Sequence, residues 1–294
     1  MEKDQYSPSA VRKLRDRYGF RFSKRLGQHF LTDQNIIDKI ISGAEIGNED
    51  LVIEIGPGMG VLTAAAAERA AAVVAVELDR ALIPILEDRF KDYANVEIQN
   101  GDILKTDIGA IVERCAAAGK SAGRVKLIGN LPYYITTPII MKVLEDRAPV
   151  DSMTFMMQKE VAERIISPAG SKGCGAISAV VQYYCLPVHI ANVPREVFVP
   201  KPAVDSAVIR FDIRKEKAVP LSEKCFFAVI KAGFGKRRKT LLNSMTGVEG
   251  LSREAAAAAI AAAGIDAGRR AETLNLKEFS VLSDAVFTID FLRN

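Results

Sequence analysis

The sequence is poor in the residue types that build metal centres and disulfide frameworks. Among its 294 residues are two histidines, four cysteines and no tryptophan. The cysteines stand far apart, without the paired spacing of metal ligands, and a chain of this length rarely depends on disulfides. The histidines are too few and too separated for a His-based metal centre. We therefore expect no metal site and a reducing, cytoplasmic setting.

Long apolar runs are also missing. No stretch approaches the roughly 20 apolar residues of a membrane span, and the polar start "MEKDQYSPSA" does not have the pattern of a secretory signal. Apolar residues make up 49% of the chain and charged residues 26%, the balance of a globular protein with an ample core. The length indicates one large domain, or one domain plus a small one. The missing apolar runs lead us to expect no membrane partner.

Positive charge is concentrated in two places, although the net charge is only +4. Residues 1–25 carry eight Lys/Arg against three acids, and residues 231–240, "KAGFGKRRKT", carry five bases and no acid. Such concentration is typical of a surface that meets a polyanion, nucleic acid in particular. A solvated face with a basic tail is the alternative interpretation. We call Lys236, Arg237, Arg238 and Lys239 the basic cluster.

Strand and helix patterns alternate along the first part of the chain. Apolar strand-like segments are each followed by a helical pattern, and Thr32 or Asp33 is a candidate N-cap for the first helix. The expected strands cover residues 50–56, 71–79, 95–104, 125–130 and 152–158. This alternation predicts an α/β fold with a parallel, doubly wound sheet and helices on both faces.

The pattern changes after residue 170. Residues 171–184 begin with a glycine-containing segment and continue as a helical pattern. Residues 188–193 and 205–214 resemble strands, and only helical patterns follow Pro220. The charged stretch 214–220 ends in proline and marks a boundary. We therefore predict a basic arm at 1–25, an α/β domain at 26–214 and a small all-α domain at 215–294.

A glycine-rich loop follows the first expected strand. In "VIEIGPGMGVLT", Gly56, Gly58 and Gly60 stand between a strand and a helix, where glycine permits a tight turn and lets a ligand approach the backbone near a helix N-terminus. The G-x-G-x-G spacing departs from the G-x-G-x-x-G of dinucleotide dehydrogenases, which disfavours an NAD-dependent oxidoreductase. A purely structural turn is the alternative.

Polar residues end the next strands. Glu77 stands about 20 residues past the glycine loop, where an acid can accept both ribose hydroxyls of a nucleoside. Asp102 and Asn130 end the following strands, and ligands of open α/β sheets bind at such ends. Each acid alone also fits a surface turn, but we expect the three and Gly56 to share one site.

The segment "NLPYY" begins with Asn130, whose amide offers an acceptor oxygen and two donor hydrogens. The Leu131 carbonyl cannot bond to the next residue, because Pro132 has no N–H. Asn130 and Leu131 can therefore accept both hydrogens of an exocyclic amine, while Tyr133 stacks on its ring. A proline turn with two packing tyrosines is the alternative.

Several blocks, together with "EIGPGMG" and "VELD", carry a resemblance to one family. They are "KRLGQHFL" (24–31), "NLPYYITTPI" (130–139), "FMMQKEVAERI" (155–165), "VFVPKPAVDSAVIRF" (197–211) and "GFGKRRKTLLNSM" (233–245). From about residue 20 onward the chain resembles the bacterial small-subunit ribosomal RNA adenine dimethyltransferases. The resemblance implies a Rossmann-like domain that binds S-adenosylmethionine, followed by a small helical domain.

The resemblance also implies roles for single residues. The 24–31 segment closes over the methionine part of the cofactor, and Phe198 forms with Tyr133 an aromatic sandwich around a flipped adenine. Many relatives have Asn where His29 stands, which favours a backbone contact there. Phe198 also fits an ordinary core residue before a proline turn. The implied cofactor residues are Gln28, His29, Leu31, Gly56, Glu77, Asp102 and Asn130; the implied catalytic residues are Asn130, Leu131, Tyr133 and Phe198.

The implied reaction is dimethylation of the exocyclic amines of two adjacent adenines in a 3′-terminal hairpin of 16S rRNA. The resemblance further implies a monomer that acts on an immature small ribosomal subunit. We expect the basic cluster to bind this rRNA, with a merely solvated helix start as the alternative. Two other functions stay open: a large-subunit rRNA methyltransferase of the macrolide-resistance type, and a non-catalytic assembly factor.

Overall fold

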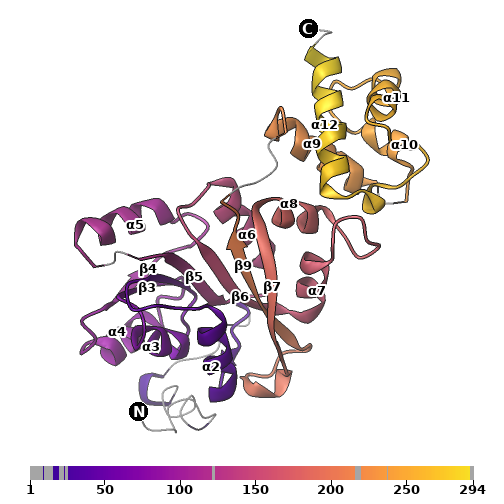
Figure 1. Cartoon of the computed structure of the whole chain (residues 1–294). Helices are drawn as coiled ribbons and strands as arrows, with labels where there is room; N and C mark the ends of the chain where they lie inside the picture. The colour runs from indigo at the N-terminus through magenta and orange to yellow at the C-terminus, as the bar shows by residue number, and fades with distance from the viewer. Residues whose placement is uncertain are drawn as a thin grey trace. The chain divides into compact units, whose positions relative to one another are not determined.

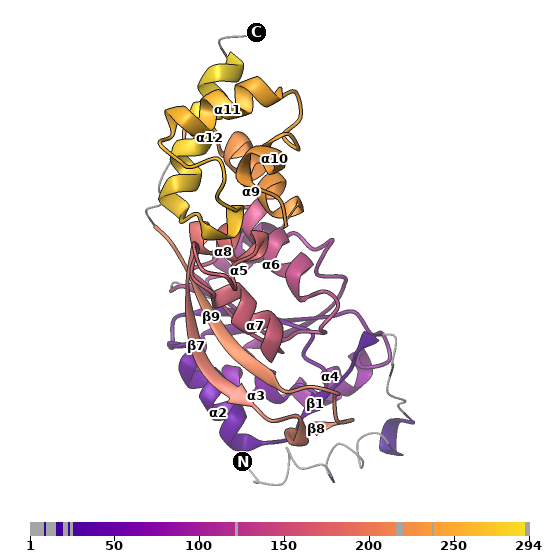
Figure 2. The ribbon, with the colours of Figure 1, turned by 90° about the vertical axis from the view of Figure 1, so that its right-hand side faces the viewer.

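The computed structural model describes residues 9, 16–19, 23, 26–120, 123–215, 220–236 and 238–291, which divide into two compact units (Figures 1 and 2). The first unit contains the described residues up to Ala162 together with Pro187–Ile213. The second contains Glu163–Leu186 and the described residues from Arg214 onward. Most of the predicted basic arm, and Arg237 of the basic cluster, lie outside the described residues.

A seven-stranded sheet with the order β4-β3-β2-β5-β6-β9-β7 forms the centre of the fold. Strands β2 to β6 are parallel to their neighbours, as the alternating pattern predicts, and β9 pairs antiparallel with β6. The bounds are β2 (Leu51–Ile55), β3 (Ala72–Glu77), β4 (Val96–Asn100), β5 (Val125–Asn130), β6 (Ser152–Gln158), β7 (Cys185–Val193) and β9 (Ser206–Ile213).

Helices cover both faces of this sheet. On one face, α2 and α3 pack on Val52, Val73 and Ile128, and the Asp33 side chain caps α2 by accepting from the Ile36 N–H at 3.1 Å. Side chains alternate along a strand, so the strand neighbours of Val52, Val73 and Ile128 face the other side of the sheet, where α5 lies (Figure 1). The helices are α2 (Gln34–Gly43), α3 (Val61–Ala67), α4 (Ile83–Phe90), α5 (Ile108–Ala117) and α6 (Thr136–Glu145).

Two short strands form a second, two-stranded sheet beside the glycine loop. β1 (Phe30–Leu31) pairs antiparallel with β8 (Phe198–Val199), which follows the short helix η2 (Arg195–Val197). The Phe30 ring lies so close to Gly58 that a Cβ added there would be 2.9 Å from it. This pairing places the residue before β1 next to the residue after β8.

The second unit is helical. The rings of Tyr183 and Phe226 lie 4.8 Å apart, so α8 packs on α9, and this is why residues 163–186 group with the C-terminal helices. The predicted division after residue 214 differs from the two units in this segment. No helix within the described residues is long and apolar enough to cross a membrane. The helices are α7 (Lys159–Ile166), which begins in the first unit, α8 (Ala176–Tyr184), α9 (Glu223–Gly235), α10 (Leu241–Met245), α11 (Arg253–Ala262), η3 (Ala271–Thr273) and α12 (Leu276–Phe291).

Candidate active site

A cleft in the first unit lies at the carboxyl ends of β2, β3 and β5 and at the loop after β4. This is the edge at which ligands of open α/β sheets bind. Predicted site residues from distant parts of the sequence meet here. Those that line the cleft are Gln28, His29, Leu31, Gly56, Glu77, Asp102, Asn130, Leu131 and Tyr133.

The glycine loop has a backbone that other residues adopt only with strain. Gly56, Gly58 and Gly60 have φ values of 67°, 59° and 74°, in the left-handed region. A Cβ at Gly60 would lie 2.5 Å from the Phe90 ring, whereas a Cβ at Gly56 would meet nothing within 4 Å. Gly60 is therefore required by packing, and Gly56 leaves its backbone open to a ligand.

Glu77 is a buried group of the site rather than a surface turn residue. Its side chain accepts from the Gly58 N–H at 3.2 Å and from the Asp79 N–H at 2.8 Å, which ties the glycine loop to the end of β3. Burial raises the pKa of Glu77. Asp102 is half-buried and accepts from the Leu104 N–H at 3.0 Å. Both carboxyls have lone pairs left for a polar ligand.

Glu54 is a cleft residue that the sequence pattern did not indicate. It lies within β2, is 1% exposed, and accepts from the Thr63 hydroxyl at 2.5 Å. Burial raises the pKa of Glu54 to about 8, the bond from Thr63 opposes the shift, and the nearby Glu77 adds to it. The signal was an acid in an otherwise apolar strand, "VIEIG". With this pKa, Glu54 is mainly protonated near pH 7 and is a neutral polar group beside the cleft.

The side chain of Asn130 is held by a hydrogen bond to the segment before β1. Its Nδ2 donates to the His29 carbonyl at 2.8 Å, so Oδ1 is the amide atom that can accept from a ligand. The Leu131 N–H donates to the Met156 carbonyl at 3.1 Å, while Pro132 has no N–H for the Leu131 carbonyl. Two acceptors from adjacent residues therefore stand at the cleft.

The Tyr133 side chain is held by a hydrogen bond and by a stacking contact. Its hydroxyl shares a hydrogen bond of 2.9 Å with the Ser206 hydroxyl on β9, and burial raises the pKa of Tyr133. Its ring is stacked with the His29 ring at a centroid distance of 5.9 Å. Phe198 is different: it is 3% exposed, belongs to the core beneath α2 and α3, and is not among the described residues that line the cleft.

The segment before β1 is tied to the turn after β3 through Gln28. Its side-chain oxygen accepts from the Ser23 N–H at 2.8 Å, and its nitrogen donates to Asp79 at 2.7 Å. Leu31 is 2% exposed and packs into the core beneath α2. This segment is thereby positioned along one side of the cleft.

The basic cluster belongs to the second unit. Lys236 is the C-cap that follows α9, the Lys239 N–H donates to the Lys236 carbonyl at 2.8 Å, and α10 begins only at Leu241. The described residues of the cluster, Lys236, Arg238 and Lys239, therefore lie in a turn between two helices and not at a helix start. Lys236, Arg238 and Lys239 are exposed.

Comparisons with known proteins show the family of the chain. The model of the family "Ribosomal RNA adenine dimethylase" matches residues 19–286. The chain is 49% identical to ribosomal RNA small subunit methyltransferase A of Alkaliphilus metalliredigens, over 95% of this chain and 97% of that one. The protein of the same name from Clostridioides difficile is 48% identical, over 96% of each chain.

Solved structures share the fold. A dimethyladenosine transferase from Plasmodium falciparum has a TM-score of 0.70 at 24% identity, over 86% of this chain and 95% of that one. The 23S rRNA methyltransferase ErmE has a TM-score of 0.65 at 24% identity, over 87% and 99%. With the family match over most of its length, the chain belongs to the ribosomal RNA adenine dimethylase family.

Proposed function

We propose that this protein dimethylates the exocyclic amines of two adjacent adenines in a 3′-terminal hairpin of 16S rRNA, with S-adenosylmethionine as methyl donor. The paired acceptors of Asn130 and Leu131 beside Tyr133 carry the proposal, because they match a planar ring with an amine. The near full-length relatives named for the small subunit favour that substrate over large-subunit rRNA. The enzyme acts as a cytoplasmic monomer on the immature subunit.

The residues of the cleft fit the cofactor. The open backbone of Gly56 admits it, Glu77 accepts from its ribose and Asp102 from its adenine. The backbone at His29, with Gln28 and Leu31, covers its methionine part. When bound, S-adenosylmethionine supplies an electrophilic methyl group from its sulfonium.

Asn130 and Leu131 prepare the attacking nitrogen. The lone pair of an adenine amine is delocalised into the ring, and two acceptors on its hydrogens favour a pyramidal nitrogen that regains this pair. Tyr133 holds the ring by stacking, a contact of about 1–3 kcal/mol, and placement in attack geometry contributes several kcal/mol, up to roughly 7–11 in ideal cases. Water takes the released proton. After the first transfer one N–H remains, so one acceptor loses its partner.

The basic cluster binds rRNA phosphates and helps offset the few kcal/mol needed to unstack a base. Replacing Lys236, Arg238 and Lys239 by alanine together should make the salt dependence of rRNA binding shallower, by about 0.7–0.9 in the log–log slope for each phosphate that is no longer neutralised. The measurement is binding of the hairpin across a salt series. An unchanged slope would remove these exposed residues from the interface.

The function is tested by incubating the protein with labelled S-adenosylmethionine and unmethylated small subunits, and then mapping the modified nucleotides. We expect label on two adjacent adenines of 16S rRNA. Matched large subunits serve as the control. Label there instead would indicate an enzyme of the macrolide-resistance type, and cofactor binding without transfer would indicate an assembly factor.

A further inference from the structure

The two tyrosines of "NLPYY" have different surroundings. Tyr133 is half-buried and its hydroxyl is bonded to Ser206, whereas Tyr134 is 57% exposed. The interpretation of this segment as a turn with two packing tyrosines therefore does not hold for Tyr134. Its side chain still lines the cleft, together with Asn130 from the same turn. Tyr134 thus places an exposed aromatic ring at the rim of the candidate active site.

Exposure alone does not indicate a binding site, because single apolar side chains are common on protein surfaces. The position of Tyr134 distinguishes it from the others. Among the described residues, the exposed large apolar side chains include two aromatic ones, Tyr134 and Phe287. Of these two, only Tyr134 lines the cleft. An aromatic ring at this place offers a flat apolar surface beside the point where the target base is to enter.

The backbone that carries Tyr134 is fixed. The Pro132 carbonyl accepts from the Ile135 N–H at 3.1 Å and from the Thr136 hydroxyl at 3.2 Å, where α6 begins. The side of the ring with Cδ1 and Cε1 lies against Gly27, where an added Cβ would be 3.6 Å from Cε1. A ring supported by a fixed turn and by a neighbouring segment loses little conformational freedom when a ligand stacks on it.

The proposed substrate brings a flat group to this rim. The target adenine must leave its stack to reach Asn130, so the base next to it loses a stacking partner. That base is covalently linked to the target, and Tyr134 follows Asn130 by four residues at the same cleft. Stacking on an aromatic ring is tolerant of base identity, because every base has a π face. This tolerance suits an enzyme that turns each of two adjacent adenines into the cleft, since their neighbours differ.

We propose that the Tyr134 ring is a stacking platform for the nucleobase next to the target adenine, a site separate from the one that holds the target. This inference rests on the proposed function. The platform keeps the unstacked strand at the rim while Asn130 holds the target amine inside. Because the strand has one polarity, the base on the platform is always on the same side of the target. In one of the two rounds it is the other adenine.

A thermodynamic cycle between the ring and the neighbouring base tests the proposal. The RNA is a hairpin with the two adjacent adenines, and two further hairpins have an abasic site in place of one or the other. Fluorescence anisotropy measures binding without methyl donor. For one abasic hairpin, loss of the base and Tyr134→Ala should each weaken binding about tenfold, and the two together should weaken it no more than either alone.

Three further variants separate stacking from bulk. Tyr134→Phe keeps the ring and should bind like the wild type. Tyr134→Leu keeps an apolar contact with Gly27 and should bind as weakly as the alanine variant. Phe287→Ala removes the other exposed aromatic ring, on α12, and should show no coupling to the abasic site. Since Tyr134 is exposed, its variants should unfold near the wild-type temperature.

The contrary results are equally specific. Additive losses for both abasic hairpins would overturn the platform, and wild-type binding by Tyr134→Leu would make the side chain a packing group. Equilibrium dialysis of labelled S-adenosylmethionine should give Tyr134→Ala the wild-type affinity. A clear loss would make the ring a latch that acts through Gly27 on the segment covering the cofactor. If wild-type protein transfers no label to small subunits, the proposed function itself fails, whatever the cycle gives.

Discussion

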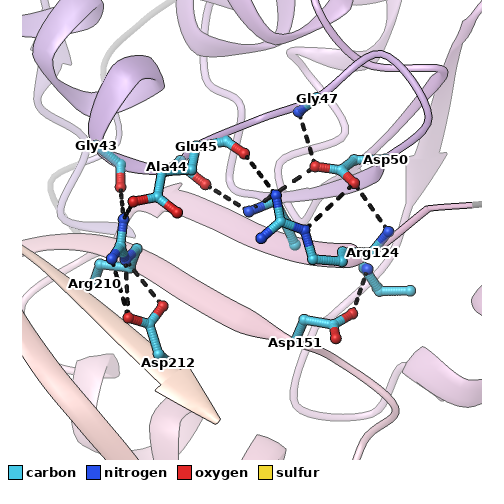
Figure 3. A network of polar contacts seen from close by, with 11 residues as sticks. Gly43, Ala44, Glu45, Gly47, Asp50, Arg124, Asp151, Arg210 and Asp212 are labelled. Atoms are coloured by element: carbon cyan, nitrogen blue, oxygen red, sulfur yellow. Dashed lines mark hydrogen bonds and ion pairs between the residues drawn. The ribbon is translucent and has the colours of Figure 1, made fainter.

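The two ends of the central strands differ in how their polar groups are satisfied. At the amino ends, charged side chains bind one another and the end of α2 (Figure 3). At the carboxyl ends, Glu77, Asp102 and Asn130 each make protein contacts but face a cleft and retain acceptor positions. The same sheet thus has one closed polar end and one open polar end.

The closed end is a network around Asp50, which accepts from the Gly47 N–H at 2.8 Å and the Arg124 N–H at 2.9 Å. Lys126, 2% exposed, donates to the Ala44 carbonyl at 2.8 Å. Arg210 donates to the Gly43 carbonyl at 2.9 Å. Two cations therefore bind the last carbonyls of α2, where the helix dipole favours positive charge.

The difference separates stability from function. Groups that satisfy one another leave nothing for a ligand, so we expect substitutions at the closed end to change stability and leave methyl transfer by the folded enzyme intact. Groups that keep acceptor positions at a cleft bind ligands, so substitutions at the open end should change chemistry more than stability.

Lys126→Ala should have the largest effect. It removes a buried cation whose carbonyl and carboxylate partners cannot turn to water, so we expect the free energy of unfolding to fall by about 3–5 kcal/mol. Lys142→Ala removes a lysine from an i,i+4 pair with exposed Asp146 and should cost less than about 0.5 kcal/mol. Urea denaturation measures both. Methyl transfer by folded Lys126→Ala should stay within twofold of wild type; a large loss would break the comparison.

Asn130→Ala should have the opposite effect: a large loss of methyl transfer with little change in stability. The variant lacks Oδ1, the proposed acceptor for the attacking amine. The rate of methyl transfer should therefore fall by about 100- to 1,000-fold, as for other single positioned hydrogen bonds in active sites. Binding of the rRNA hairpin should stay near wild type. Asn192→Ala, an exposed asparagine of β7, is the matched control and should be fully active. Single-turnover kinetics on small subunits decides; wild-type turnover in the Asn130 variant would remove it from the mechanism.

Glu54 makes the stability of the open end depend on pH. Its folded pKa, about 8, lies above the ordinary value of 4.5. The stabilisation by its neutral form is therefore complete below about pH 4.5 and lost as pH rises through about 8. Glu54→Gln keeps a neutral acceptor for Thr63, so between pH 5 and 9 the variant should gain up to several kcal/mol relative to wild type. Urea denaturation of both proteins at pH 5 and pH 9 measures this. The same difference in the free energy of unfolding at the two pH values would contradict the prediction.

The sequence predicted the open end better than the closed one. Strand ends are legible in a βα pattern, so Gly56, Glu77, Asp102 and Asn130 were expected together, and all four line the cleft. Glu54 was missed because its neighbour Thr63 lies on the following helix, and the one local signal, an acid inside an apolar strand, does not show what that acid faces. At the closed end, Lys126 and Arg210 come from strands far apart in the chain, and only the sheet order brings them to α2.

Long-range pairing explains the other differences. β1 meets β8 across nearly 170 residues, and this pairing buries Phe198 and leaves His29 beside Tyr133. No periodicity encodes that register. The segment 163–186 has ordinary helical patterns, and its place in the second unit depends on aromatic contacts such as Tyr183 with Phe226. Resemblance supplied residue roles, but not which ring faces which.

The smallest effect should come from the rim of the closed end. Glu45 pairs with Arg210 at 2.5 Å but is 56% exposed, and the bond from Arg210 lowers the pKa of Glu45. Its stabilisation is therefore present above the ordinary carboxyl pKa and lost as pH falls through the lowered folded value. Since solvent screens exposed pairs, Glu45→Gln should cost less than about 1 kcal/mol at pH 7. Denaturation at pH 7 and pH 3 checks the sign; a cost near that of Lys126→Ala would place the stabilisation in the rim and not in the buried centre.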